Sequence, residues 1–320
     1  MSKRSEFYLS STDGRTNLHA VKWEPEGEIK AILQISHGMV EFIERYDEFA
    51  RYLNSRGFLV VGHDHLGHGK SIFSKEDYGY FAEKHPNETV IADIYEVTKK
   101  IKAENEGVPY FLLGHSMGSF YARQYFAEHG EELDGIIIMG TGGQPAILAR
   151  TGLALTFIMA KMKGWHYRSK LIDNMAFGGY NKRFEPARTS KDWLTKDETI
   201  VDTYISDERC QFIFTLNGYR SIFTALIKLS KKSYLERMPK SLPVLLISGK
   251  EDPVGNFGKS ILKLEKRYQR LGIEAVTCRL YETDRHEILN ELDRDTVYEE
   301  IGDWLLDKVV KEGCICLTSE

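Results

Sequence analysis

The chain has 320 residues, of which 42% are hydrophobic and 28% are charged, a composition typical of folded globular domains. Its formal net charge is −4 at pH 7, and its basic residues are dispersed along the whole chain. This pattern excludes the basic stripe that nucleic-acid-binding proteins carry, so we expect no nucleic-acid partner.

The cysteines and the N-terminal sequence indicate a reducing compartment. Cys210, Cys278, Cys314 and Cys316 show neither C-x-x-C spacing nor a dense disulfide framework, as expected for reduced thiols. The first dozen residues are polar and lack the apolar centre of a signal peptide. The uncharged stretch 151–160 is far shorter than the ~20 residues of a membrane-spanning helix. We therefore expect a cytoplasmic protein that is at most peripheral to a membrane.

Apolar runs rich in β-branched and aromatic residues predict the strands. They are residues 6–10, 18–23, 31–36, 58–63, 110–113, 135–139, 244–248 and 275–281. The later runs are continuously apolar, as in parallel strands that are buried on both faces. The alternation with helical segments predicts an α/β fold, a mostly parallel eight-stranded sheet flanked by helices.

Helical spacing fills the gaps between these strands. Residues 44–56 carry one apolar face, and Asn87 is a plausible N-cap for the helix that follows it. Gly272 is well placed to end a helix over residues 261–271, and residues 297–309 form a terminal amphipathic helix.

Residues 140–238 break the alternation. They contain no convincing strand but do contain helical, aromatic and Met-rich sequence such as "LALTFIMAKMKGW". A segment of this length is too long for a plain loop. We therefore predict a helical cap at 140–238, inserted into a core domain made of residues 1–139 and 239–320.

A glycine-flanked serine forms the most informative motif. Gly114, Ser116 and Gly118 give a G-x-S-x-G pattern directly after the predicted strand 110–113 and before helical sequence. In such a strand, tight turn and helix, the glycines let the serine adopt a strained conformation that exposes its hydroxyl. We therefore predict that Ser116 is a nucleophile rather than an ordinary helix N-cap.

A serine nucleophile needs a base, and the base needs an acid that orients it. Asp252 follows the predicted strand 244–248, and His286 follows the strand 275–281. The carboxyl ends of parallel strands meet at one edge of a sheet, and the chain order Ser, Asp, His fits a catalytic triad. We predict Asp252 as the orienting acid and His286 as the base.

Other carboxylates near these strand ends are weaker candidates for the acid. Asp252 is preferred over Glu251 because its shorter side chain, in a turn before Pro253, can be held more rigidly. Glu282 and Asp284 lie closer to the histidine in sequence and remain open as alternatives.

An acyl transfer also needs two N–H groups to stabilise the oxyanion. The amide of Met117, next to the nucleophile, is one candidate. The loop "ISHGMVEF" follows an earlier strand and offers the amide of Met39, after Gly38, as the second.

A rival chemistry is indicated by the histidine-rich segment "HDHLGHGKS". His63, His65 and His68 are spaced like part of a metal-binding cluster of zinc hydrolases. Gly67 stands where that cluster has an aspartate, and no further His or Cys series completes a site. We therefore expect a polar turn beside the active site and no metal.

The motifs "SHGMVEFIERY", "GHDHLGHGKS", "LLGHSMGS", "GKEDPVG" and "DRHEIL" together resemble those of the α/β-hydrolase superfamily. The most similar branch is the monoacylglycerol lipase and lysophospholipase-like group, of the serine aminopeptidase S33 type. The resemblance covers nearly the whole chain. It implies a Ser116, Asp252 and His286 triad, oxyanion amides at Met39 and Met117, and a cap at 140–238.

The resemblance also implies a function, namely cofactor-free cleavage of acyl esters through an acyl-enzyme. The family often has a histidine where this chain has Phe42, which should make the entrance more apolar. We expect monoacylglycerols or lysophospholipid-like esters as substrates and a transient contact of the cap with membranes. The predicted substrate-binding residues are Phe42, His115, Leu153, Phe157, Phe177 and Val254.

Two further functions stay open on this fold. An aminopeptidase would need an acidic pocket for a free amine, which Glu41, Asp202 or Glu208 could supply. A non-catalytic ligand receptor could keep the triad and turn over negligibly. Acyl-chain length, head group and oligomeric state have no signal in the sequence.

Overall fold

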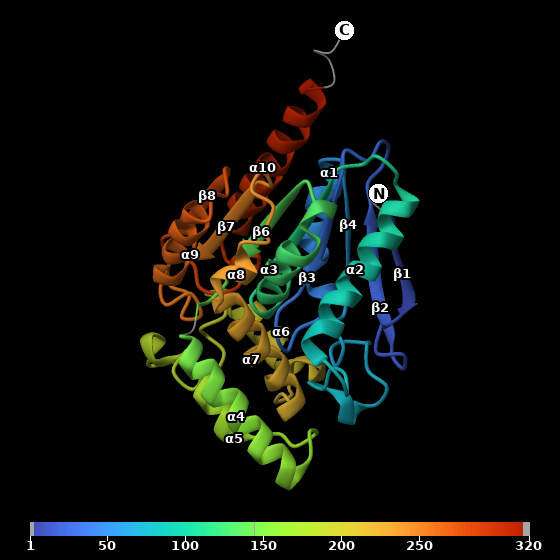
Figure 1. Cartoon of the computed structure of the whole chain (residues 1–320). Coiled ribbons are helices and arrows are strands. Elements are labelled where there is room, and N and C mark those ends of the chain that lie inside the picture. Colours follow the sequence, from blue (N-terminus) through green and yellow to red (C-terminus); the bar gives the residue numbers. More distant parts are fainter. Residues whose placement is uncertain (1–2, 144, 316–320) are drawn as a thin grey trace.

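Within the residues that the structure describes, 3–143 and 145–315, eight strands form one central sheet (Figure 1). The structure is a computed structural model, with side chains described up to residue 310. In spatial order the strands are β1 (Lys3–Ser10), β2 (Asn17–Glu24), β4 (Phe58–His63), β3 (Ala31–Ser36), β5 (Tyr110–His115), β6 (Gly135–Met139), β7 (Val244–Gly249) and β8 (Val276–Tyr281). The β1–β2 and β2–β4 pairs are antiparallel and the others parallel, which confirms the predicted sheet.

Helices cover both faces of the sheet and create two apolar cores. Helices α2 (Pro86–Glu104), α3 (Met117–His129) and α9 (Lys259–Arg270) pack on one face, and α1 (Asp47–Ser55) and α10 (Arg294–Ile315) pack on the other. Successive strand residues point to opposite faces, so on β5 Leu112 enters the first core and Leu113 the second. This explains why the central strands are continuously apolar in sequence.

The predicted N-cap of α2 is wrong. Its N-cap is His85 rather than Asn87, and the helix begins at Pro86, two residues earlier than predicted. The Asn87 side chain instead donates to Gln124 Oε1 at 2.9 Å, tying α2 to α3. Gly272 follows α9 with φ +84°, a left-handed conformation that suits glycine, and so ends this helix as predicted.

Five helices lie between β6 and β7, where the cap is predicted. They are α4 (Ala146–Lys163), α5 (Lys170–Phe177), α6 (Glu198–Ser206), α7 (Leu216–Ser230) and α8 (Lys232–Leu235). Among the described residues of this insertion the only β pairing is an isolated bridge between Arg168 and Thr215. The division of this insertion from the core at 140–238 stays a prediction.

Short 3-10 turns occur in the core and in the insertion. They are Ile43–Tyr46, Lys75–Asp77, Gly130–Glu132, Lys182–Phe184, Glu208–Cys210 and Ile288–Asn290.

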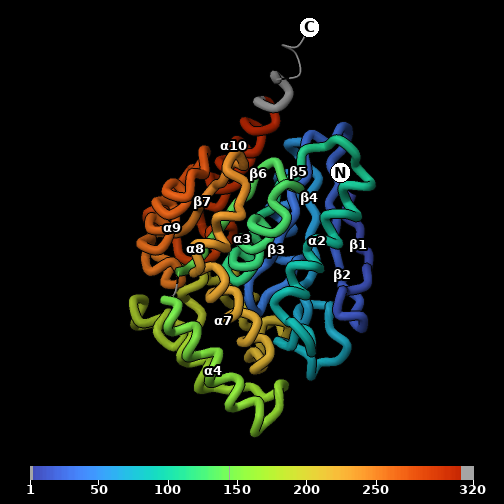
Figure 2. Tube along the Cα trace, in the orientation of Figure 1, coloured from blue at the N-terminus to red at the C-terminus, as the bar shows by residue number. Residues whose placement is uncertain are grey.

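The insertion is anchored to the core along α7. This helix packs against α4 on one side and against α2 and α3 on the other. In Figure 2, α4 lies at the end of the molecule opposite to the one from which α10 extends.

Cys210 and Cys278 are free thiols, whereas Cys314 and Cys316 lie outside the described side chains.

Candidate active site

Ser116 lies on a sharp turn between β5 and α3. Its backbone has φ 51° and ψ −118°, a strained conformation for a residue with a side chain. A Cβ at Gly118 would collide with the carbonyl oxygens of Ser36 and His37, and one at Gly114 would collide with Ala122. The two glycines are therefore needed because β3, β5 and α3 approach so closely here.

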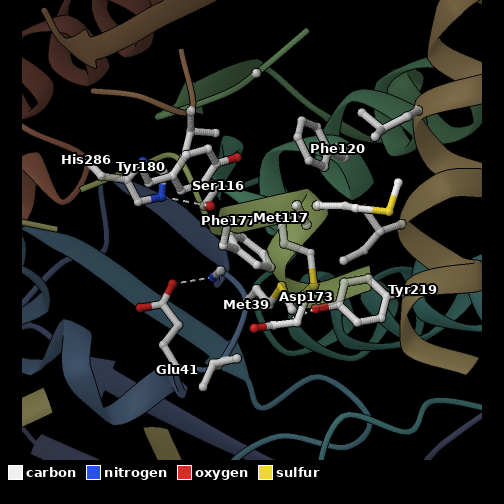
Figure 3. A pocket seen from close by; sticks show the side chains of 18 of the residues that line it. Met39, Glu41, Ser116, Met117, Phe120, Asp173, Phe177, Tyr180, Tyr219 and His286 are labelled. Atoms are coloured by element: carbon white, nitrogen blue, oxygen red, sulfur yellow. Dashed lines mark hydrogen bonds between the residues drawn. The ribbon is translucent and has the colours of Figure 1, made fainter. Parts of the chain in front are cut away.

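His286 and Asp252 lie next to this serine. His286 Nε2 is 2.8 Å from Ser116 Oγ (Figure 3). On the other side of the ring, Nδ1 is 3.0 Å from Asp252 Oδ1, although the N–H direction falls short of hydrogen-bond alignment. Asp252 is fully buried, and the Val254 amide donates to its Oδ1 at 2.8 Å. The structure thus brings together the three residues predicted as a triad.

The three competing carboxylates all have other partners. Glu251 pairs with Arg183 at 3.2 Å, and Glu282 pairs with Lys250 on the surface. Asp284 is buried, but its Oδ1 lies 3.2 Å from Lys196 Nζ rather than against the histidine.

The loop after β3 passes close to Ser116. A Cβ at Gly38 would lie 3.2 Å from Ser116 Cβ, so the loop passes close to the nucleophile. Met39 follows in this loop, and Met117 opens α3, where an amide has no partner within its own helix. Both residues line the cavity beside Ser116. That their amides stabilise an oxyanion stays a prediction.

A buried network holds the Met39 loop and the residue before Ser116. Glu41 accepts from the Gly38 amide and from Tyr46 at 3.0 Å, and it lies 3.0 Å from His115 Nδ1. Burial opposes the charged form of His115, but Glu41 outweighs it and raises the pKa of this imidazole. For Glu41, burial favours the neutral acid, yet His115 and Arg45 hold the pKa of the carboxyl below its usual range. Glu41 is therefore occupied by internal partners.

Arg45 connects this network to the histidine loop. Its guanidinium donates to Glu41 at 2.9 Å and to both oxygens of Glu287 at 2.8 and 2.7 Å. Glu287 follows His286 directly, and its amide donates to Leu194 O of the insertion at 2.7 Å. Two-pronged Arg–carboxylate pairs fix orientation as well as charge. The network thus fixes the histidine loop relative to the Met39 loop.

Ser116 and His286 open into a cavity of about 330 Å³ between the core and the insertion. Of the predicted site residues, Met39, His115, Met117, Phe177 and Val254 also line it. Further lining comes from the insertion, with Leu148, Ala149, Tyr180, Lys191, Trp193, Tyr204, Tyr219, Ile222, Phe223 and Leu226.

Three predicted substrate-binding residues do not line this cavity. Phe42 is buried and packs with Tyr204. The guanidinium carbon of Arg209 lies 3.6 Å from the centroid of the Phe42 ring. Leu153 and Phe157 lie on other faces of α4, because Ala149 and Gly152 occupy the side that faces the cavity. The Phe157 side chain is 46% exposed.

The histidine-rich turn forms a buried cluster. His63, His65 and His68 are fully buried, and the His65 amide donates to His37 Nε2 at 2.9 Å. Burial lowers the pKa of all three imidazoles, to about 3 for His63 and His68. Among the described residues, no group of three or more His, Cys, Asp or Glu side chains is arranged to hold a metal ion.

Sequence reasoning missed several residues that contact the cavity. The Trp193 ring lies 5.1 Å from the His286 ring, and the Tyr180 ring lies 5.0 Å from that of Trp193. Both come from the irregular segment between α5 and α6. No motif or periodicity marks such a segment, so no signal in the sequence could have found them.

The fold and site define an α/β-hydrolase with a serine beside a histidine and a buried aspartate. The model of the family described as serine aminopeptidase, S33, matches residues 27–293. The chain belongs to this family and is a serine hydrolase. In its described part, no helix is both long enough and apolar enough to cross a bilayer.

Relatives and solved structures support ester hydrolysis. The chain is 29% identical over 314 residues to the monoglyceride lipase of Rattus norvegicus, covering 97% of this chain and 93% of the relative. The crystal structure of a carboxyl esterase from Bacillus coagulans, in complex with glycerol, matches with a TM-score of 0.89 and 28% identity, over 96% and 99% of the two chains. A soluble variant of monoglyceride lipase from Saccharomyces cerevisiae, 18% identical, matches with a TM-score of 0.74 over 94% of both chains and shows the same fold.

Proposed function

We propose that the protein hydrolyses single-chain lipid esters, either monoacylglycerols or lysophospholipid-like esters, with Ser116 as nucleophile. Ser116 Oγ attacks the ester carbonyl while His286 Nε2 takes its proton and then returns it to the leaving alcohol. Asp252 orients His286, and the amides of Met39 and Met117 stabilise the oxyanion. Water, activated by the same histidine, releases the fatty acid and restores the serine.

The observation that carries this proposal is the 2.8 Å contact between Ser116 and His286 at the floor of a cavity with an apolar side. That side is lined by Phe120 of α3, by α4 at Leu148 and by α7 at Phe223 and Leu226. An acyl chain gains free energy by leaving water for such a surface. The name of the rat monoglyceride lipase supports the same substrate class, and that of the Bacillus carboxyl esterase supports ester cleavage.

The arrangement of the cavity disfavours an aminopeptidase. Asp202 and Glu208 do not line it and pair with Arg188 and Lys75 instead. Glu41 does line it but is bound by Arg45 and His115. A free amine would also meet Lys191, another cation on the cavity wall.

A panel of substrates tests the proposed function. We expect p-nitrophenyl esters to be cleaved faster as the acyl chain lengthens from acetate to laurate, because a longer chain buries more apolar surface. We also expect hydrolysis of monolauroylglycerol and negligible cleavage of alanyl-arylamide. Arylamide cleavage exceeding ester cleavage would instead establish the aminopeptidase.

We propose that the cap contacts anionic membrane surfaces. Residues 140–238 contain 16 Lys and Arg against nine Asp and Glu, although the whole chain is net negative. Apolar side chains are exposed on α4 and α5, including Ile158 at 61% and Met162 at 78%. Apolar area together with positive charge favours an anionic lipid surface. The cytoplasmic location stays a prediction.

Vesicle sedimentation tests this contact. We expect several-fold more binding to vesicles with phosphatidylglycerol than to phosphatidylcholine alone, and weaker binding at high salt. The double variant Ile158→Glu, Met162→Glu should lose most of the binding. Val310→Glu, at a residue of α10 that is 63% exposed, is the matched control and should bind normally. Equal binding by the double variant and the control would refute the contact.

A further inference from the structure

Lys191 is an unusual residue in a cavity that accepts lipids. It lies on the segment between α5 and α6 and lines the cavity that contains Ser116 and His286. Its backbone is held in a turn, where its amide donates to Thr189 Oγ1 at 3.1 Å and its carbonyl accepts from Leu194. The turn therefore fixes the point from which the ammonium group reaches the cavity.

Within the described part of the chain, the ammonium group of Lys191 has no ion-pair or hydrogen-bond partner. Its nearest aromatic neighbour is Tyr204, with Nζ 5.7 Å from the ring centroid. Burial lowers the pKa of this lysine, against the attraction of Asp173, Cys210 and Glu287. A partly buried ammonium group without a direct partner gains a charge-assisted hydrogen bond when it binds an anion.

The carboxylates that line the same cavity already have partners. Glu287 is held by two hydrogen bonds from Arg45, and Asp173 accepts from the Tyr219 hydroxyl at 2.7 Å. Glu41 is shared between Arg45 and His115. Arg45 and His115 thus offset Glu41 and Glu287. Asp173 has no ion pair among the described residues and attracts Lys191 only from beyond ion-pair distance, so the Lys191 ammonium group stays available to a ligand.

Lys191 lies at the polar end of the cavity. Arg45 packs over the same Tyr204 ring, with its guanidinium carbon 5.0 Å from the centroid. Arg45 in turn binds Glu287, the neighbour of His286. The apolar side chains of α4 and α7 supply the other wall. An ester whose acyl chain lies on the apolar wall would have its alcohol part at the polar end of the cavity, where Lys191 lies.

We propose that Lys191 selects esters whose alcohol part carries an anionic oxygen group, such as the phosphate of a monoacylglycerol phosphate. This inference rests on the proposed function and narrows its substrate class. A lysine ammonium group is a compact phosphate ligand, and a charge-assisted hydrogen bond is stronger than a neutral one. An anionic substrate therefore gains a contact that a neutral monoacylglycerol does not make.

The hydrolysis test compares two esters that differ only in the phosphate, monolauroylglycerol and monolauroylglycerol phosphate. We expect the ratio of their kcat/KM values, anionic over neutral, to fall about tenfold or more in Lys191→Gln. Lys191→Arg should restore most of the ratio, and Lys191→Glu should lower it further. Lys232→Gln, at a cap lysine with 80% side-chain exposure, is the control and should keep the wild-type ratio. The same ratio in Lys191→Gln and the control would overturn the proposal, as would an equal loss on both esters.

A binding test separates this proposal from the proposed function, since it needs no turnover. Calorimetry would measure the binding of octyl phosphate and of neutral octyl glucoside, each below its critical micelle concentration. We expect tighter binding of octyl phosphate to the wild type and to Lys232→Gln, and loss of this advantage in Lys191→Gln. Lys191-dependent binding without hydrolysis of either ester would contradict the proposed function and leave anion recognition in place. Displacement of octyl phosphate by an equal concentration of inorganic phosphate would show a site for free phosphate and overturn the substrate proposal.

Discussion

Replacing Ser116 with alanine is expected to lower kcat/KM for monolauroylglycerol by roughly 10⁴-fold or more, the scale seen when a serine nucleophile is removed. The change deletes the only side-chain oxygen that lies 2.8 Å from His286 Nε2 in the described structure. The residual rate should come from the oxyanion amides and from substrate binding. Initial rates of fatty-acid release on purified wild type and variant measure the effect.

The variant should remain folded. Ser116 occupies a strained conformation and makes no side-chain contact that holds α3 in place. Thermal unfolding of the two proteins is therefore expected to agree within a few degrees, so the loss of rate can be assigned to chemistry. Retention of more than a few per cent of wild-type activity by the folded variant would rule out Ser116 as the nucleophile.

Replacing Asp252 with asparagine is expected to lower kcat by about 10³- to 10⁴-fold. The carboxylate faces His286 Nδ1 at 3.0 Å. In the proposed mechanism it stabilises the imidazolium that forms during attack. An amide of the same shape lacks the charge and can hold the ring in the wrong tautomer. Steady-state kinetics on the same ester would measure the loss, which should appear in kcat more than in KM.

Glu251 provides the matched control for Asp252. It is the neighbouring acid, but it pairs with Arg183 and stands away from the histidine. Glu251→Gln should stay within about threefold of wild-type kcat, since surface ion pairs contribute little. Equal losses in the two variants would mean that the turn, rather than the Asp252 carboxylate, supports activity.

The sheet could be predicted from the sequence because its strands are buried on both faces. Runs such as 135–139 and 244–247 are apolar throughout, and both lie in strands of the structure. The predicted N-cap residue of α2 is wrong. Pro86 also fits the first helical position, and His85, the observed N-cap, takes a left-handed conformation. Side-chain preference at Asn87 alone could not distinguish these two starts.

The close placement of Ser116, Asp252 and His286 followed from simple geometry. Each follows a strand of a parallel sheet, and the carboxyl ends of such strands meet at one edge. The two glycines around the serine predict a tight turn. The close approach of Ser36 to Gly118 explains why a glycine is needed there. Their catalytic roles stay a prediction until the variants are measured.

The walls of the cavity could not be predicted in the same way. The apolar character of Leu153 and Phe157 predicts that they bind substrate. In the structure, however, α4 is oriented so that Ala149 and Gly152 face the cavity instead. Helical periodicity identifies an apolar face without showing which neighbour that face meets. Lys191 reaches the site from an irregular segment, so its position depends on tertiary contacts alone.

Covalent labelling with a fluorophosphonate, read by intact mass and by mapping of the labelled peptide, is the sharpest test that Ser116 is an activated nucleophile. We expect one added group, located on Ser116, in the wild type and none in Ser116→Ala. Because the reagent needs an activated serine hydroxyl, single labelling at this position would establish both the nucleophile and its activation. No label, or a label on another residue that persists in Ser116→Ala, would contradict the account.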